Sequence, residues 1–187
     1  MRKEIRIAGF GGQGVILSGL IISVAAGLHE DREVAQTQSY GPESRGGACR
    51  AEVVISDAEI DYIKPMDPDV LVAMSQPALD RYLGEMDTMR AAILVDSSLV
   101  SSVPDGIAHL YPIPVTDIAE MKLGKRVVAN MVMLGALSAI IGIVSYDALA
   151  QSIGETLPKK MVDLNLAALK EGFEEGRRLA AKETALS

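Results

Sequence analysis

The stretch from Glu4 to Gly27, EIRIAGFGGQGVILSGLIISVAAG, decides the fold. Its first residues alternate in polarity and end in the glycine run Gly9-Phe10-Gly11-Gly12-Gln13-Gly14. An almost uninterrupted apolar segment then extends from Val15 to Ala26 and stops at Gly27. This order predicts a strand, a glycine-rich turn and a buried helix, the opening unit of an α/β fold.

Further strands and helices alternate along the rest of the chain. We expect strands at residues 33–38, 48–55, 60–63, 70–74, 92–95 and 109–112, and helices at 78–83, 116–123, 127–142, 146–153 and from 158 onward. This interleaving predicts a three-layer α/β/α fold with a mostly parallel, Rossmann-like sheet, in which 48–55 is the candidate antiparallel strand. We expect residues 1–187 to form one domain.

Composition and charge exclude several classes of protein. Lys and Arg number 18 against 25 Asp and Glu, a formal charge of −7 with no basic stripe, so we expect no nucleic-acid partner. Cys49 is the only cysteine, which excludes an intrachain disulfide and an Fe–S or cysteine-based zinc site made by this chain alone. With no secretory signal at Met1, these features predict a cytoplasmic protein.

Two segments are apolar on more than one face. Residues 127–144 contain no charge over eighteen positions, about the minimum for a membrane-spanning helix, but they include Asn130 and Ser138. We therefore expect a buried helix and no membrane span. A single sheet covers only one face of this helix or of the helix from Val15 to Ala26, so we expect part of each to be buried against another subunit or a second copy of the chain.

Gly9, Gly11 and Gly14 satisfy the GxGxxG pattern between a strand and a helix, where backbone N–H groups attract phosphate. The dinucleotide-binding version needs an acidic residue at the end of the second strand, and that end reads Gln36-Thr37-Gln38. Two alternatives remain open from the residues alone. The chain is a free-standing, nucleotide-binding Rossmann oxidoreductase, or its glycines only let helix and strand approach closely.

A second loop extends the pattern: the glycine run is followed by Tyr40-Gly41-Pro42-Glu43-Ser44-Arg45-Gly46-Gly47, and Asn130 begins an Asn-x-x-x-Leu-Gly segment ending at Gly135. With these three motifs the chain resembles the gamma subunits of the 2-oxoacid:ferredoxin oxidoreductases from Ile5 to about Phe173. The wording of the second loop is more similar to the 2-oxoglutarate and branched-chain 2-oxoacid enzymes than to the pyruvate or indolepyruvate enzymes.

The resemblance implies one subunit of a complex that decarboxylates a 2-oxoacid on thiamine diphosphate, passes electrons through Fe–S clusters to ferredoxin, and transfers the acyl group to coenzyme A. It implies alpha, beta and possibly delta (ferredoxin-like) partner subunits, which hold the thiamine diphosphate and the clusters. This chain is then inactive alone, and its share is to shape the cavity and to bind coenzyme A. A purely architectural subunit without a ligand is the remaining alternative.

The candidate ligand-contacting residues are Gly11, Gly12, Gln13, Gly14, Tyr40, Glu43, Arg45, Gly46 and Asn130. We assign no catalytic residue and no metal ligand. Two roles remain open for Arg45, a contact to a carboxylate or phosphate and a brace against a partner subunit. Three further residues each have a ligand-contacting and a structural alternative. Tyr40 stacks on a cofactor or packs against protein, and Glu43 touches ligand or pairs with a nearby cation or backbone amide. Asn130 reaches the ligand cavity or anchors a loop by hydrogen bonds; we favour the structural role for all three.

We also expect Gly11–Gly14 and Gly41–Gly47 to form a single cleft. The two loops follow the first and second strands, and the ends of parallel neighbouring strands emerge at the same edge of the sheet.

Overall fold

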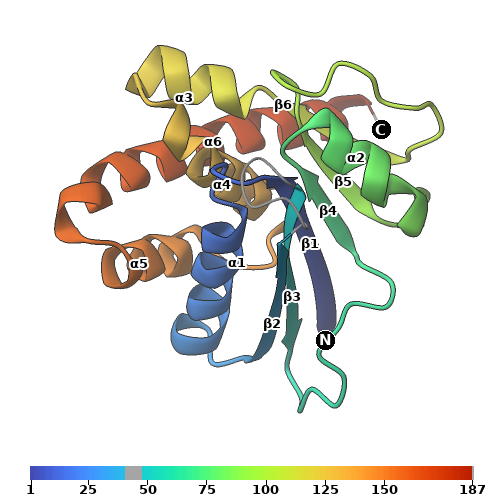
Figure 1. Cartoon of the computed structure of the whole chain (residues 1–187), viewed down its shortest axis with the longest axis horizontal. Helices are drawn as coiled ribbons and strands as arrows, with labels where there is room; N and C mark the ends of the chain where they lie inside the picture. The colour runs from blue at the N-terminus through green and yellow to red at the C-terminus, as the bar shows by residue number, and fades with distance from the viewer. Residues whose placement is uncertain (41–47, 187) are drawn as a thin grey trace.

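The computed structural model describes residues 1–40 and 48–186. At its centre lies a six-stranded sheet in the order β2-β3-β1-β4-β5-β6 (Figure 1). The strands are β1 (Arg2–Phe10), β2 (Glu33–Tyr40), β3 (Ala48–Ser56), β4 (Val70–Ala73), β5 (Ala92–Asp96) and β6 (His109–Ile113). The alternating and apolar runs of the sequence therefore predict these strands to within about two residues.

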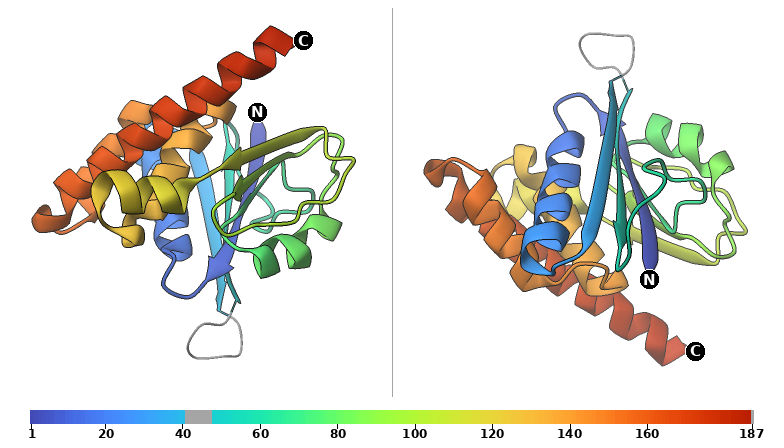
Figure 2. Two further views of the ribbon diagram at one scale, coloured as in Figure 1. Left: turned by 90° about the horizontal axis from the view of Figure 1, so that it is seen from above. Right: turned by 90° about the horizontal axis from the view of Figure 1, so that it is seen from below.

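Helices cover both faces of the sheet, but unequally (Figure 2). The larger layer consists of α1 (Val15–Val24), η1 (Ala25–His29), α3 (Val115–Leu123), η3 (Arg126–Val128), α4 (Ala129–Ile141), α5 (Tyr146–Thr156) and α6 (Lys159–Leu186). The other face packs on α2 (Gln76–Tyr82) and the adjoining η2 (Leu83–Glu85). The predicted three-layer α/β fold is confirmed.

β3 is the antiparallel strand. It pairs with β1 from Phe10↔Ala48 to Arg2↔Ser56 and with β2 on its other side, whereas β1, β4, β5 and β6 are parallel. The expectation that the first two strands are neighbours is wrong, because β3 lies between them. β1 and β2 nevertheless run in the same direction, since each is antiparallel to β3.

The strand expected at residues 60–63 is absent from the structure, where 57–69 form an irregular connection from β3 to β4. Pro65 and Pro68 lack the N–H that a ladder requires. The backbone N–H groups of Met66 and Asp67 donate instead to the Glu4 carboxylate.

A charged pair is buried on the α2 face of the sheet. Arg6 Nε on β1 donates to Glu52 Oε1 on β3 at 2.8 Å, and both side chains are 6% exposed. The other end of the guanidinium contacts Glu85 at 2.6 Å, and Arg6 stacks over the Tyr82 ring. This pairing offsets the desolvation of both charges.

α4 is buried inside the chain because α6 covers the side that faces away from the sheet. The two helices meet backbone to backbone: a Cβ added to Gly172 would lie 1.8 Å from the Val132 carbonyl oxygen, and one on Gly135 would lie 2.0 Å from that of Leu169. The expectation that α4 needs another subunit is therefore wrong. Within the described residues, no helix combines the length and hydrophobicity needed to cross a bilayer.

Candidate functional site

The connections of the sheet reverse direction between β1 and β4. β1 leads through α1 on one face towards β2, whereas β4 leads through α2 on the opposite face to β5. In open α/β sheets, ligands bind in the crevice that such a reversal leaves at the carboxyl ends of the strands. The glycine run that follows β1 occupies this position.

Two glycines give the turn its shape. Gly12 and Gly14 have φ of 96° and 71°, in the left-handed region that favours glycine, and Gly14 is the N-cap of α1. At Gly14 a side chain is also excluded by space, because a Cβ would lie 2.4 Å from Asn130 Nδ2. The turn is therefore specified by backbone conformation and by packing together.

Gln13 ties the glycine turn to the neighbouring strand. Its Oε1 accepts from the Phe10 N–H at 2.7 Å, and its Nε2 donates to the Met74 carbonyl, just beyond β4, at 2.7 Å. Gly9 permits this clip, since a Cβ there would lie 2.5 Å from Gln13 Oε1. One amide hydrogen and one lone pair of Gln13 remain for another partner.

Asn130, at the start of α4, anchors the same turn. Its Nδ2 donates to the Gly14 carbonyl at 3.3 Å, and the residue is only 4% exposed. This contact is the loop-anchoring role that we favoured over direct ligand contact. It joins two motifs that lie 116 residues apart in the sequence.

A pocket of about 260 Å³ opens at this point. Its lining is mostly apolar with a few polar groups, which is typical of small-molecule sites. The residues that line it are Gly12, Gln13, Met74, Thr116, Arg126, Val127 and Ala129. It thus lies beside the N-termini of α1, α3 and α4. The first N–H groups of α3 already donate to Asp96 and Ser98, and the Ala129 N–H of α4 donates to the Arg126 carbonyl, so the N-terminus of α1 is the one of the three suited to negative charge.

Sequence reasoning missed the polar wall of the pocket, which is formed by Thr116 and held by Asp96. Asp96 is fully buried at the end of β5, where its Oδ2 accepts from Thr116 Oγ1 at 2.5 Å and its Oδ1 accepts from the N–H groups of Ser98 and Thr116. An acidic residue that ends an otherwise apolar strand was the available signal. Asp96 fixes the start of α3 and the orientation of the Thr116 hydroxyl.

Two cations lie on the connection between α3 and α4. Arg126 lines the pocket, is exposed, and has a long ion pair of 3.7 Å with Glu120. Lys125 is also exposed and forms no ion pair with any residue that the structure describes. In a chain of net charge −7, these cations give the pocket mouth a local preference for anions.

The second loop is only partly described. Tyr40 ends β2 and is paired with Cys49, at the same edge of the sheet as the glycine turn. Glu43, Arg45 and Gly46 lie outside the described residues, so the single cleft stays a prediction. Cys49 is buried on the face of the sheet that α1 covers, and burial raises the pKa of its thiol, as suits an inert core residue.

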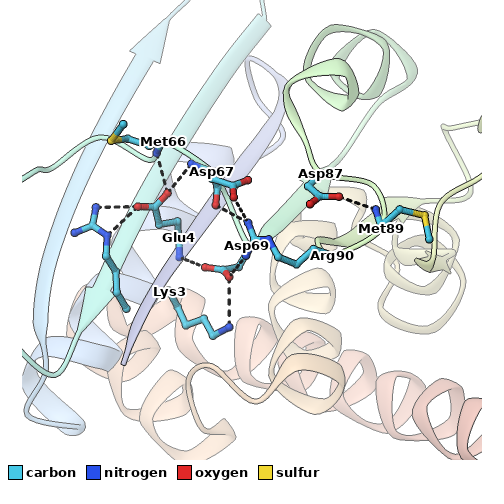
Figure 3. Close-up of polar contacts among 9 residues, drawn as sticks. Lys3, Glu4, Met66, Asp67, Asp69, Asp87, Met89 and Arg90 are labelled. Carbon is cyan, nitrogen blue, oxygen red and sulfur yellow. Dashed lines mark hydrogen bonds and ion pairs between the residues drawn. The ribbon is translucent and has the colours of Figure 1, made fainter.

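A more open hollow, of about 230 Å³, lies at the opposite edge of the sheet, and its charged groups pair with one another (Figure 3). Glu4 accepts from the backbone of Met66 and Asp67 and from Arg2. Asp69 accepts from Arg90 and from the Glu4 N–H. These contacts fasten the 57–69 connection to β1 and β5, so we assign the cluster a structural role.

Gly12 and Gly14, the two positive-φ glycines of the turn, allow a matched test. Gly14→Ala is expected to lower the free energy of unfolding by about 2 to 4 kcal/mol, because it adds backbone strain, displaces Asn130 and breaks the bond to Gly14. Gly12→Ala adds strain alone, about 1 to 2 kcal/mol, since no atom lies within 4 Å of its Cβ position. Urea unfolding followed by circular dichroism measures both; equal losses would contradict the role of Asn130.

The chain is similar in sequence and in structure to known proteins. A family model described as pyruvate ferredoxin/flavodoxin oxidoreductase matches residues 4–175. The chain is 46% identical over 181 residues to the 2-oxoglutarate synthase subunit KorC of Methanocaldococcus jannaschii, and the alignment covers 96% of both chains.

Two solved structures share the fold and more than a quarter of the aligned residues. The gamma subunit of a keto/oxoacid ferredoxin oxidoreductase from Geobacter sulfurreducens matches with a TM-score of 0.85 and 39% identity, covering 94% of this chain and 97% of that one. The 2-oxoglutarate:ferredoxin oxidoreductase of Magnetococcus marinus, solved with 2-oxoglutarate, coenzyme A and succinyl-CoA bound, matches with a TM-score of 0.83 and 26% identity. That match covers 95% of this chain but 31% of the longer chain.

Proposed function

Because the chain belongs to the pyruvate ferredoxin/flavodoxin oxidoreductase family, we propose that it is the gamma subunit of a 2-oxoacid:ferredoxin oxidoreductase that converts 2-oxoglutarate to its acyl-CoA. Identity of 46% over nearly the full length to a 2-oxoglutarate synthase subunit supports this substrate over branched-chain 2-oxoacids and indolepyruvate. The alternative of a purely architectural subunit predicts that no ligand binds in the pocket beside the glycine turn.

The observation that carries a ligand-binding role is the pocket itself. It combines apolar walls, the Thr116 hydroxyl, the N-terminus of α1 and an exposed guanidinium at one mouth. Coenzyme A has matching parts: a pantetheine arm of methylenes and amides, and a diphosphate with a further phosphate. We propose that the arm lies in the pocket and that the phosphates lie towards Lys125 and Arg126.

The pocket is too small for the whole of coenzyme A. A volume of about 260 Å³ lies below the range of roughly 300 to 1,000 Å³ for complete drug-sized sites. The remainder of the cofactor therefore extends beyond this chain, towards other subunits and towards the loop with Tyr40, Glu43, Arg45 and Gly46. Gly11–Gly14, held by Gln13 and Asn130, forms the rigid wall of this site.

The redox cofactors belong to other subunits in this proposal. One buried cysteine cannot ligate an Fe–S cluster, and the described residues contain no group of three His, Cys, Asp or Glu side chains placed to hold a metal. We propose that alpha, beta and possibly delta subunits carry thiamine diphosphate and the clusters, that ferredoxin accepts the electrons, and that the complex is cytoplasmic. This chain binds and orients the acyl acceptor.

A free-standing nicotinamide-dependent oxidoreductase is disfavoured by the strand order. In the dinucleotide fold the second strand lies beside the first and ends in the acid that holds the ribose. Here β3 lies beside β1, and β2 ends in Gln38-Ser39-Tyr40. Titration of the purified chain with NADH and NADPH tests this alternative, which predicts tight binding of one of them.

Arg126→Ala is expected to raise the KM of the assembled complex for coenzyme A about tenfold, through the loss of a charge-assisted hydrogen bond. The kcat at saturating coenzyme A should stay within twofold. Lys122→Ala is the matched control, because Lys122 lies in the last turn of α3, shortly before the same connection, but is paired with Glu171 on α6. Arg45→Ala should raise the same KM if the second loop shares the site.

Three results would count against the proposal. Catalysis by the isolated chain would contradict its role as a dependent subunit. Equal KM values for Arg126→Ala, Arg45→Ala and wild type would favour the architectural subunit. A complex that uses pyruvate or a branched-chain 2-oxoacid in preference to 2-oxoglutarate would overturn the substrate assignment alone.

A further inference from the structure

α1 lacks the polar outer face expected of a surface helix. It contains no charged residue, and Ile16, Leu20, Val24 and, just beyond it, Leu28 follow in steps of four along one side of the helix. Ile16 at one end of this row is partly buried against the core. We call these four residues the α1 ridge. Leu20 is 40% exposed and Leu28 is 73% exposed. A helix that is apolar all round is normally buried.

Other helices of the same layer carry charges on their exposed positions. α6 exposes Lys170, Glu174 and Arg178, and α5 exposes Asp147 and Glu155. The same layer also exposes Met121 and Met161, but these stand next to charged residues in the sequence, whereas α1 contains none. The apolar exposure of α1 marks one place at which another surface is expected to pack.

The free edge of β2 lies beside the α1 ridge. Figure 2 shows α1 running along β2; Gly19 of α1 lies close to Gln36, and Gly27 of η1 lies close to Val34. β2 has eight residues, with no Pro and with Glu33 as its one charge. β6, at the other edge, has five residues and contains Pro112.

These two edges differ in their protection against pairing. Short length and proline are devices that block the addition of a strand, and β6 has both. β2 has neither, so its backbone edge and the α1 ridge together form a continuous surface that is suited to burial.

We propose that another subunit of the oxidoreductase complex docks on this surface, and that the docking face of that subunit is apolar at its centre and basic at one border. The proposal rests on the proposed function. Two exposed acids, Asp31 and Glu33, border the surface without ion pairs to any described residue, so the partner should carry cations opposite them.

A different subunit fits this surface better than a second copy of the chain. The net charge of −7 makes two copies repel. The Magnetococcus marinus enzyme also contains a domain of this fold as about a third of a longer chain. In that protein the domain is covalently joined to further protein, which is consistent with a face built to pack against a different domain.

Leu20→Lys and, separately, Leu28→Lys test the proposal in the complex purified through an affinity tag on this chain. We expect thiamine diphosphate and iron per tagged chain to fall at least tenfold, together with 2-oxoglutarate-dependent dye reduction. Leu28 is exposed enough for the second variant to fold even if the first does not, and thermal melting checks both. Met89→Lys is the control: it introduces the same charge at an exposed apolar residue away from this surface, in the turn before β5, and should stay within twofold of wild type.

Each outcome has a distinct meaning. Wild-type chain that purifies without thiamine diphosphate and iron would remove the proposed function, and the docking proposal with it. Folded Leu20→Lys and Leu28→Lys variants that retain both cofactors would overturn the docking surface and leave the function standing. A dimer of the isolated chain that sediments as a monomer after Leu20→Lys would make a second copy the occupant, against the proposal.

Discussion

Gly172→Ala is expected to lower the free energy of unfolding by about 3 kcal/mol or more, near the upper end for single substitutions. The added Cβ would lie 1.8 Å from the Val132 carbonyl oxygen and 2.9 Å from its Cα, which are backbone atoms of α4. No side-chain rotation can relieve this contact, so α4 and α6 must separate. Urea unfolding followed by circular dichroism measures the loss.

Gly154→Ala is the matched control for this substitution. Gly154 is also a helical glycine, in α5, but no atom lies within 4 Å of its Cβ position. Alanine should therefore stabilise the chain by about 0.5 to 1 kcal/mol through helix propensity. If both variants change stability in the same direction, close packing of α4 against α6 is not what Gly172 provides.

Glu52→Ala is expected to cost about 3 to 5 kcal/mol, because it leaves the buried Arg6 guanidinium without its best-shielded partner. Glu85→Ala removes the other carboxylate on Arg6. That side chain is 53% exposed, so water replaces it and the cost should be about 1 kcal/mol or less.

A double variant separates charge from packing at this position. Arg6→Met combined with Glu52→Leu removes both charges and keeps apolar volume, so it should recover most of the stability lost by Glu52→Ala. A double variant as unstable as Glu52→Ala would show that the cost arises from lost packing and not from an unpaired buried charge. Equal losses in Glu52→Ala and Glu85→Ala would also contradict the argument.

Local patterns in the sequence predicted the elements, and at the glycine turn they predicted part of the site. The alternation of Cys49, Ala51, Val53 and Ile55 identified β3 and its buried face, as the structure confirms. The glycines between β1 and α1 located the turn because glycine adopts the φ values of Gly12 and Gly14 without the strain that a side chain would add. Asn130 stood out as an amide in an apolar helix and proved to anchor that turn.

Long-range order was not predictable in the same way. Side-chain periodicity reports which face of an element is buried but not which element buries it, so the cover that α6 provides for α4 was missed. Strand order is likewise set by packing among all elements, so the place of β3 between β1 and β2 had no local signal. Thr116 and Asp96 meet only once β5 and β6 are adjacent.

Because β3 pairs along its whole length with both β1 and β2, it can be misplaced in the sheet only by a slip in register of one or more whole residues. Successive side chains of a strand point to opposite faces, so a slip of one residue would turn Arg50 and Glu52 towards α1 and Val53 towards the α2 side. No hydrogen-bonded register lies between two such positions, and a slip of one residue removes the apolar side chains of β3 from the core beneath the strand. Phe10 and Tyr40 are the residues from which the two loops depart, and their relative position is set by the register of β3 against β1 and β2. A mutation or partner that shifts β3 would therefore displace one loop against the other by whole residues and not by smaller distances.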